Sequence, residues 1–462
     1  MIKDSLLYFL SKFLPSIITL LSLFLFMKYM NTDEYGKYSI LIVTAGLINI
    51  FTTQWLRSSM LKFNKEELDI FATLQMMVIA ITSIIIFIYS FIFNISILFC
   101  LLLILVQISL SLNEYLNNIF RLKLLPKIIM ISNFIRSLVL LVSLLIATYI
   151  INDLNFVTAV LSFWFSLTIS NLYYRFQLSK FNLPVNFMDI YKLNNNKNLI
   201  NKSLSYGLPI TIAFTVGVAL QNIDKYMITH ILSISETGKY SLPFDTIHNF
   251  MYLIMGSMGA ASLPRLLKMN DKNKIESNFE QYLYYFYLIN IPLFTLLISN
   301  INIIKLVFNQ NGYTTSKYII LFIILSTFAH GTKSFVYDQA VQLENKTNII
   351  FIPSIIAIVM TIIINYLFLK RFGVVAAAFS SMLSFTTSNL LTYILILRKS
   401  NYKFINNKII NILFFNIPIT IFYFVLDINN VMVSVIFTIL TVFFVNILLI
   451  IIQDRNIIRR FI

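Results

Sequence analysis

The chain has 462 residues, of which 58% are hydrophobic and 12% are charged, and its formal net charge is +16. So little polar surface excludes a soluble protein of this length. A basic balance can indicate nucleic-acid binding, but the basic residues here are scattered through short loops, where orientation in a membrane explains them better. We therefore expect an all-α polytopic membrane protein with no nucleic-acid partner.

Apolar segments recur along the whole chain, and each is long enough to cross a bilayer as a helix. They predict about 14 transmembrane helices. The weakest breaks between them lie around Asn94 and at Gly373. The approximate cores of the predicted spans are 8–30, 38–55, 70–93, 95–113, 126–150, 156–178, 205–231, 240–263, 279–299, 318–341, 348–369, 374–397, 409–426 and 431–451.

One short tract occurs twice: residues 34–39 (EYGKYS) return as residues 236–241 (ETGKYS). The copies follow the first and the seventh predicted spans, so they face the same side of the membrane. This arrangement indicates two parallel repeats related by an axis along the membrane normal. We interpret the tract as a turn, in which a flexible glycine precedes a new helix that starts at Tyr-Ser.

Charge placement predicts the orientation. If the N-terminus is cytoplasmic, most of the 35 Lys and Arg residues fall on cytoplasmic faces, as the positive-inside rule requires. We therefore expect both termini in the cytoplasm and the protein in a bacterial cytoplasmic membrane. The longest polar stretch separates the two repeats. The predicted organisation is an N-lobe at 1–180, a cytoplasmic linker at 181–204, a C-lobe at 205–398, and two further spans with a tail at 399–462.

Three stretches carry a resemblance to a known family. They are residues 26–39, residues 206–226 with YGLP and NIDKY at their ends, and residues 370–378 (KRFGVVAAA). The chain resembles bacterial polysaccharide-biosynthesis flippases of the multidrug/oligosaccharidyl-lipid/polysaccharide exporter superfamily. Members usually have Gly where this chain has Ala376.

This resemblance implies two six-helix lobes around a central cavity, with two C-terminal helices outside that core. It also implies alternating access and export of an oligosaccharide linked to polyprenyl pyrophosphate. The expected partners are that lipid-linked oligosaccharide and membrane lipids, together with a polymerase and other polysaccharide-assembly proteins.

Charged residues inside spans are costly unless they face protein or water, so they are the candidate site residues. Arg136 lies roughly 15 Å into its span at 1.5 Å per residue, too deep for easy snorkelling. An Arg fork suits phosphate oxygens, so Arg136 is the first candidate for a cationic lumen that binds the pyrophosphate. A structural pair with Asn133 is the alternative. Lys333 and Lys225 are further cationic candidates, although each could instead reach a membrane interface.

Acidic residues and one histidine are candidates for coupling transport to an ion. They are Asp224, Asp245, Asp338 and His330. Asp245 and His248 lie three residues apart and share one helix face. For each of these residues a structural ion pair or a helix-packing contact is the competing interpretation. Nearer the cytoplasmic face, Arg57 is interpreted as an interfacial charge and Glu114 as part of a solvated helix end.

Enzymatic signatures do not occur in the sequence. It has no zinc-protease, P-loop, Cys-x-x-Cys or G-x-S-x-G motif, and Cys100 is the single cysteine. We therefore expect neither an enzyme nor a metal or cofactor. Two alternatives remain open within the superfamily, a cation-coupled multidrug exporter and a peptidoglycan-precursor flippase. A membrane polymerase or ligase is disfavoured because the longest outer stretch is short.

Overall fold

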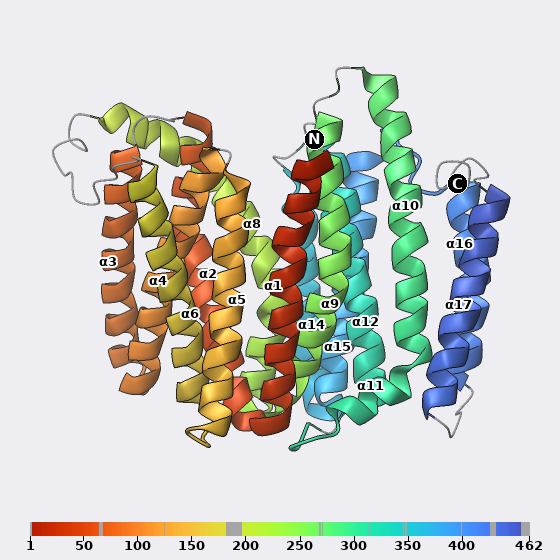
Figure 1. Ribbon diagram of the computed structural model, residues 1–462, viewed down its shortest axis with the longest axis horizontal. Coiled ribbons are helices and arrows are strands. Elements are labelled where there is room, and N and C mark those ends of the chain that lie inside the picture. Colours follow the sequence, from red (N-terminus) through yellow and green to blue (C-terminus); the bar gives the residue numbers. More distant parts are fainter. Residues whose placement is uncertain are drawn as a thin grey trace. The chain divides into compact units, whose positions relative to one another are not determined.

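The structure is a computed structural model. It describes residues 2–63, 68–123, 125–181, 196–267, 269, 271–313, 315–344, 346, 349–398, 400–425 and 431–453. Within these residues the regular elements are helices (Figure 1). A chain that spans a bilayer must satisfy its backbone hydrogen bonds internally, and helices do so segment by segment.

Two compact units divide the chain, Met1–Leu242 and Pro243–Ile462. The first unit contains α1 (Ile2–Tyr29), α2 (Thr32–Phe63), α3 (Leu68–Ile92), α4 (Ile97–Leu122), α5 (Pro126–Tyr149), α6 (Phe156–Lys180), α8 (Lys197–Ile231) and the start of α9 (Ile234–Leu267). In this unit α1 packs on α5, α5 on α6, and α4 on both α6 and α2. The longest shared interface of α2 is with α8.

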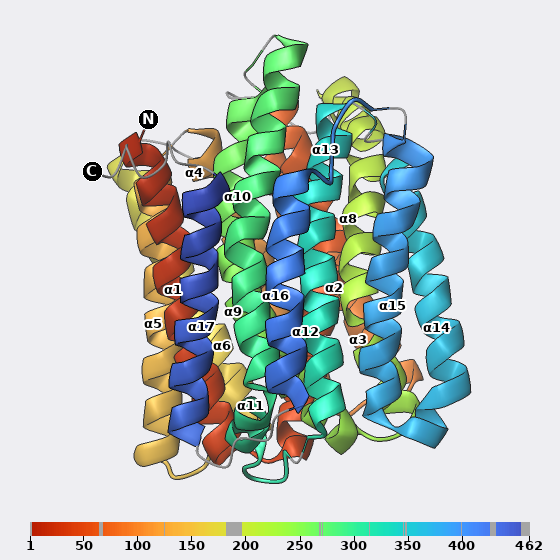
Figure 2. The same ribbon diagram turned by 90° about the vertical axis from the view of Figure 1, so that its right-hand side faces the viewer.

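The second unit contains the rest of α9 and the helices that follow it. They are α10 (Lys272–Ser299), α11 (Ile301–Phe308), α12 (Lys317–Thr332), the π-helical turn η1 (Lys333–Tyr337), α13 (Asp338–Leu343), α14 (Ile352–Phe372), α15 (Val374–Thr392), η3 (Tyr393–Leu397), α16 (Asn407–Val425) and α17 (Val431–Gln453). Here α15 packs on α12 and α14, and α16 packs on α10 and α17. Figure 2 shows α14 and α15 side by side.

The predicted spans are confirmed as helices. In the described residues, 11 helices are long and apolar enough to cross a membrane, and the apolar segments Phe13–Tyr29 and Val435–Ile451 are shorter. The remaining predicted span falls on α9. The predicted division into lobes at a linker stays a prediction, because most of that linker, residues 182–195, lies outside the described residues.

Both weak breaks are real, and each has a residue with an unusual backbone. Asn94 lies between α3 and α4 with φ 51°, and Gly373 lies between α14 and α15 with φ 60°. Side chains rarely tolerate positive φ, and Asn and Gly are the residues that adopt it most readily. Gly373 alone separates α14 from α15, whereas residues 93–96 form the break between α3 and α4.

Buried polar groups form hydrogen bonds between helices, and many large apolar side chains are exposed on the outside. Asn113 of α4 donates to Ser170 Oγ (2.8 Å) and Asn171 Oδ1 (2.9 Å) of α6, and Thr361 of α14 donates to Ser384 of α15 (2.7 Å). The side chain of Phe91 is 81% exposed on α3. Helices in lipid associate through small residues and such interhelical hydrogen bonds, because lipid tails leave no hydrophobic driving force.

Candidate functional site

The repeated tract begins two helices and brings them into contact. Gly36 lies in the first turns of α2 and Gly238 in those of α9. A Cβ atom on Gly36 would overlap the carbonyl of Ile234, and one on Gly238 would overlap the carbonyl of Thr32. The interpretation of the tract as a turn with a flexible glycine is therefore wrong. The helices start before the tract, and the glycines are required for close packing.

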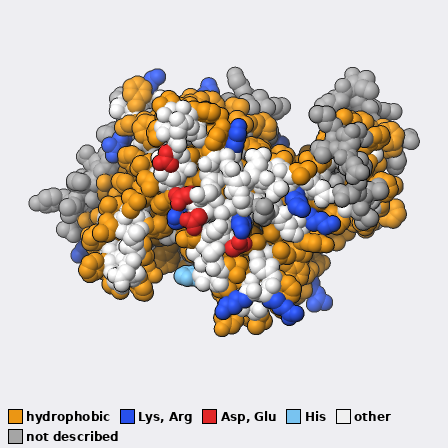
Figure 3. Space-filling view, turned by 90° about the horizontal axis from the view of Figure 1, so that it is seen from below, with side chains coloured by type: hydrophobic (Ala, Val, Ile, Leu, Met, Phe, Trp, Pro, Cys, Tyr) orange, Lys and Arg blue, Asp and Glu red, His pale blue; other side chains and the backbone are white. Residues whose placement is uncertain are grey.

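Hydrogen bonds and ion pairs surround this contact. The hydroxyls of Thr32 and Ser235 are 2.7 Å apart. Each copy of the tract has an internal ion pair, from Lys37 to Glu34 at 2.9 Å and from Lys239 to Glu236 at 2.6 Å. Acidic and basic side chains are visible together on the face that carries these turns (Figure 3).

The candidates Asp224 and Lys225 lie on α8, and their side chains are buried against the repeated tracts. They are 0% and 2% exposed. Tyr240 of α9 donates its hydroxyl hydrogen to Asp224, and Lys225 Nζ donates to Ser39 Oγ of α2 at 3.2 Å. The structure thus brings both residues together with the second-copy tyrosine and the first-copy serine. These contacts are those of a helix-packing group.

Arg136 lies on α5 and its side chain is half-buried. Its guanidinium is near enough to the Tyr174 phenol of α6 to act on it electrostatically, and so is the carboxylate of Glu114. Among the described residues Arg136 has no ion pair, and the alternative hydrogen bond to Asn133 is not formed. Arg136 is therefore a cation at membrane depth without a dedicated counter-charge in that part of the chain.

Arg57 is a second cation, and it pairs with Glu114, which also acts on Tyr174. It is 6% exposed, and its Nη1 is 3.2 Å from Glu114 Oε2 of α4. Its Nε and Nη2 atoms have no hydrogen-bond partner among the described residues. Arg57 is thus buried within the protein, and Glu114, whose side chain is 40% exposed, is its ion-pair partner.

We call Arg57, Glu114, Arg136 and Tyr174 the arginine cluster. Its charged members come from α2, α4 and α5, and together they contribute two positive charges and one negative charge. A low-dielectric site with an excess of positive charge favours an anion. Guanidinium forks suit carboxylate and phosphate oxygens in particular.

Lys333 and Asp338 form an ion pair in the second unit. Lys333 Nζ is 2.8 Å from Asp338 Oδ1 and 3.1 Å from Oδ2. Their side chains are 7% and 22% exposed. The π-helical turn between them widens the helix at this point, which lets residues five apart meet. The bond to Asp338 supports the structural interpretation of Lys333, and a role in cargo binding stays a prediction.

His330 contacts a second histidine, His248 of α9. His248 Nε2 and His330 Nδ1 are 3.2 Å apart, and both side chains are buried. Tyr252 stacks on both imidazoles, at centroid distances of 4.7 and 5.1 Å. Asp245 lies one turn before His248 and is half-buried. The sequence places Asp245 and His248 on one helix face but did not predict the His248–His330 pair, although all three histidines lie on predicted spans.

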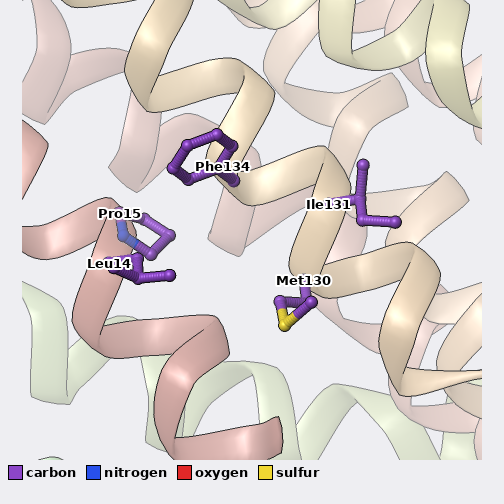
Figure 4. A pocket seen from close by; sticks show the side chains of 5 residues that line it. All are labelled: Leu14, Pro15, Met130, Ile131 and Phe134. Atoms are coloured by element: carbon purple, nitrogen blue, oxygen red, sulfur yellow. The ribbon is translucent and has the colours of Figure 1, made fainter.

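An apolar pocket lies between α1 and α5. Its lining consists of Leu14, Pro15, Met130, Ile131 and Phe134 (Figure 4). No polar side chain belongs to this lining, so the pocket suits hydrocarbon and not a charged group. Among the described residues no group of three or more His, Cys, Asp or Glu residues could hold a metal ion.

The fold places the chain in a class of membrane transporter structures. It superposes on a lipid II flippase, MurJ, in an inward closed conformation, with TM-score 0.76, 16% identity, and coverage of 99% of this chain and 100% of that one. It also superposes on an inward-facing multidrug resistance MATE family transporter of the MOP superfamily. That match has TM-score 0.63 and 12% identity, and it covers 83% of this chain and 94% of the other. At these identities the likeness shows the fold.

The family follows from the sequence match. The model of the polysaccharide biosynthesis protein family matches residues 1–270, and the chain belongs to this family. It is also similar to a protein of Shigella flexneri assigned as an O-antigen transporter, with 23% identity over 177 residues. That match covers 38% of this chain and 42% of the relative's length.

Proposed function

We propose that the protein is a flippase that moves an oligosaccharide linked to polyprenyl pyrophosphate across the bacterial cytoplasmic membrane by alternating access. Membership of the polysaccharide biosynthesis family and the transporter fold support this proposal. A sugar cannot cross hydrocarbon cheaply, because its hydroxyls would lose their hydrogen bonds to water. A flippase therefore has to carry the sugar through a polar passage while the lipid tail stays in the bilayer.

The arginine cluster is the observation that carries the choice of cargo. In the proposed cycle Arg136 contacts the pyrophosphate, because it is half-buried and has no ion pair among the described residues. Arg57 adds positive charge from a buried position next to Glu114, and Glu114 forms an ion pair with only one of the two arginines. An anionic headgroup would supply the missing negative charge.

The experiment compares Arg136 variants in cells that lack the chromosomal gene. Arg136→Ala should reduce surface glycan at least tenfold, and Arg136→Lys should retain an intermediate level because it keeps the charge but loses the fork. Lys180→Ala is the matched control, since Lys180 is an exposed cation at the end of α6. Full surface glycan with Arg136→Ala would contradict the role of Arg136.

Two rival cargoes are tested in the same strains. A cation-coupled multidrug exporter of this fold predicts that the deletion strain becomes sensitive to cationic dyes while its surface glycan is unchanged. A peptidoglycan-precursor flippase predicts that the deletion stops cell-wall synthesis. The excess positive charge of the arginine cluster favours an anionic lipid carrier over a cationic drug.

A further inference from the structure

We propose that His248 and His330 hold one proton between them and form the protonation site that couples transport to a proton gradient. The inference rests on the proposed transport function and names its coupling ion and site. It starts from the direct contact of two imidazoles from different helices, α9 and α12, at 3.2 Å. Each ring nitrogen in this contact can donate or accept, according to which tautomer is present.

The chemistry of the pair limits it to one proton. Two neutral imidazoles share one N–H···N hydrogen bond and have one further N–H. A first added proton goes to the remaining outer nitrogen, and the bond between the rings persists with the positive charge spread over both. A second proton would place two N–H groups against each other at this distance, so it requires the rings to separate. The pair therefore titrates as one unit.

Aromatic rings enclose the pair. Phe244 stacks on His248 at 5.5 Å and Phe385 stacks on His330 at 4.5 Å, while Tyr252 covers both rings. Aromatic faces attract cations, and this attraction is stronger away from water. Without a proton the same rings pack as ordinary apolar groups.

Other charged and titratable groups act on the pair from the helices packed around it. On α9 these are Tyr252 and Asp245, which lies one turn before His248. Burial of the His330 ring opposes a positive charge there, and the nearby Lys333 of η1 opposes it as well. The ion pair of Lys333 with Asp338 of α13 offsets the charge of the lysine. The pair therefore sits next to a charge that is already compensated, and one proton adds one net positive charge.

The interface between α9 and α12 that holds the pair is tightly packed, so we expect a change at the rings to displace these helices. A Cβ atom on Gly331, next to His330, would overlap the sulfur of Met255. One turn further, the ring of Phe335 lies against Gly256 and Gly259 of α9. Phe335 belongs to the π-helical turn, where the regular backbone ladder is already interrupted. Proton binding thus acts on a tightly packed interface between α9 and α12.

Histidine NMR tests proton binding without any cargo. The full chain contains three histidines, so His230→Gln leaves the pair as the only imidazoles. In the purified, ¹⁵N-histidine-labelled variant, we expect the ring nitrogens of His248 and His330 to shift together in one step as the pH is lowered, with uptake of one proton per chain. Independent titration of the two rings, uptake of two protons, or no titration at all would overturn the proposal.

The pH dependence of surface glycan in cells tests whether transport is coupled to proton binding. Surface glycan in the wild type should change several-fold with the pH of the medium, and His248→Gln or His330→Gln should make it independent of pH, because Gln hydrogen-bonds but does not titrate. His230→Gln should keep the wild-type pH dependence. Surface glycan that persists in the deletion strain would refute the transport function itself. Loss of glycan in the deletion, with pH dependence retained in both Gln variants, would refute only the histidine site.

Discussion

Gly36 and Gly238 occupy equivalent positions in the two copies of the repeated tract, and they face each other where α2 and α9 begin. A Cβ atom on Gly36 would lie 3.2 Å from the backbone nitrogen of Gly238, and one on Gly238 would lie 3.1 Å from the backbone nitrogen of Gly36. The contact is reciprocal, because each glycine lies against the backbone of the other copy. The tract is therefore conserved between the copies for packing and not as a cargo motif.

This contact predicts a selective effect of alanine at the two glycines. Gly36→Ala and Gly238→Ala should each destabilise the protein by about 1–3 kcal/mol, because each added methyl overlaps a backbone carbonyl that cannot move freely. Gly46→Ala is the control, since nothing lies within 4 Å of its Cβ position. Alanine there should be neutral or stabilising by up to about 1 kcal/mol. Thermal unfolding in detergent measures all three, and equal stability of the Gly36 and Gly46 variants would contradict the packing role.

At Gly373 there is room for a side chain, but the backbone conformation is unsuitable for one. Nothing lies within 4 Å of its Cβ position, yet its φ is 60°. We expect Gly373→Ala to cost about 1–2 kcal/mol through backbone strain alone. Gly217→Ala, in a helix and equally free of neighbours, should cost nothing. Thermal unfolding in detergent tests this expectation. A Gly373→Ala protein as stable as the wild type would show that the α14–α15 break does not depend on this backbone conformation.

The ion pair between Arg57 and Glu114 predicts that substitutions of these two residues have non-additive effects on stability. Glu114→Gln should destabilise the protein by about 2 kcal/mol, because it leaves the buried Arg57 without a counter-ion. The loss is less than for a fully buried pair, since the Glu114 side chain is 40% exposed. Arg57→Met combined with Glu114→Gln should recover most of that stability. A double-mutant cycle measures the coupling, and additive effects would mean that the two side chains do not interact in the folded protein.

The hydrogen bond from Tyr240 to Asp224 predicts a loss of stability when the tyrosine hydroxyl is removed. Tyr240→Phe removes a hydrogen bond to a fully buried carboxylate and should cost about 2 kcal/mol. Tyr366→Phe is the control, because Tyr366 is 75% exposed on α14. Chemical denaturation of both variants tests this expectation. A Tyr240→Phe protein as stable as Tyr366→Phe would show that Asp224 is held by other groups.

The fold could be predicted largely from the sequence, because hydrophobic length determines where a chain crosses a bilayer. Even the breaks at Asn94 and Gly373 follow from residues that accept positive φ. The role of Gly36 could not be predicted, since a glycine required for close approach looks the same in sequence as one required for a turn. Only the position of α9 against α2 distinguishes the two.

The candidate site was less predictable, because its residues meet across helices. The depth of Arg136 within its span could be predicted from the sequence, and so could the presence of a histidine on each of three spans. Which helices bring Arg57 to Glu114, or His248 to His330, depends on rotation and packing that no spacing encodes. Long-range pairs of this kind need the structure.

The most direct measurement is the membrane leaflet that holds the polyprenyl-pyrophosphate-linked glycan. In spheroplasts, glycan in the outer leaflet is open to an added lectin or glycosidase, and glycan in the inner leaflet is protected. We predict protection in cells that lack the protein or carry Arg136→Ala, and exposure in cells with the wild type or Lys180→Ala. Glycan that reaches the outer leaflet normally in the deletion strain would contradict the proposed flippase function.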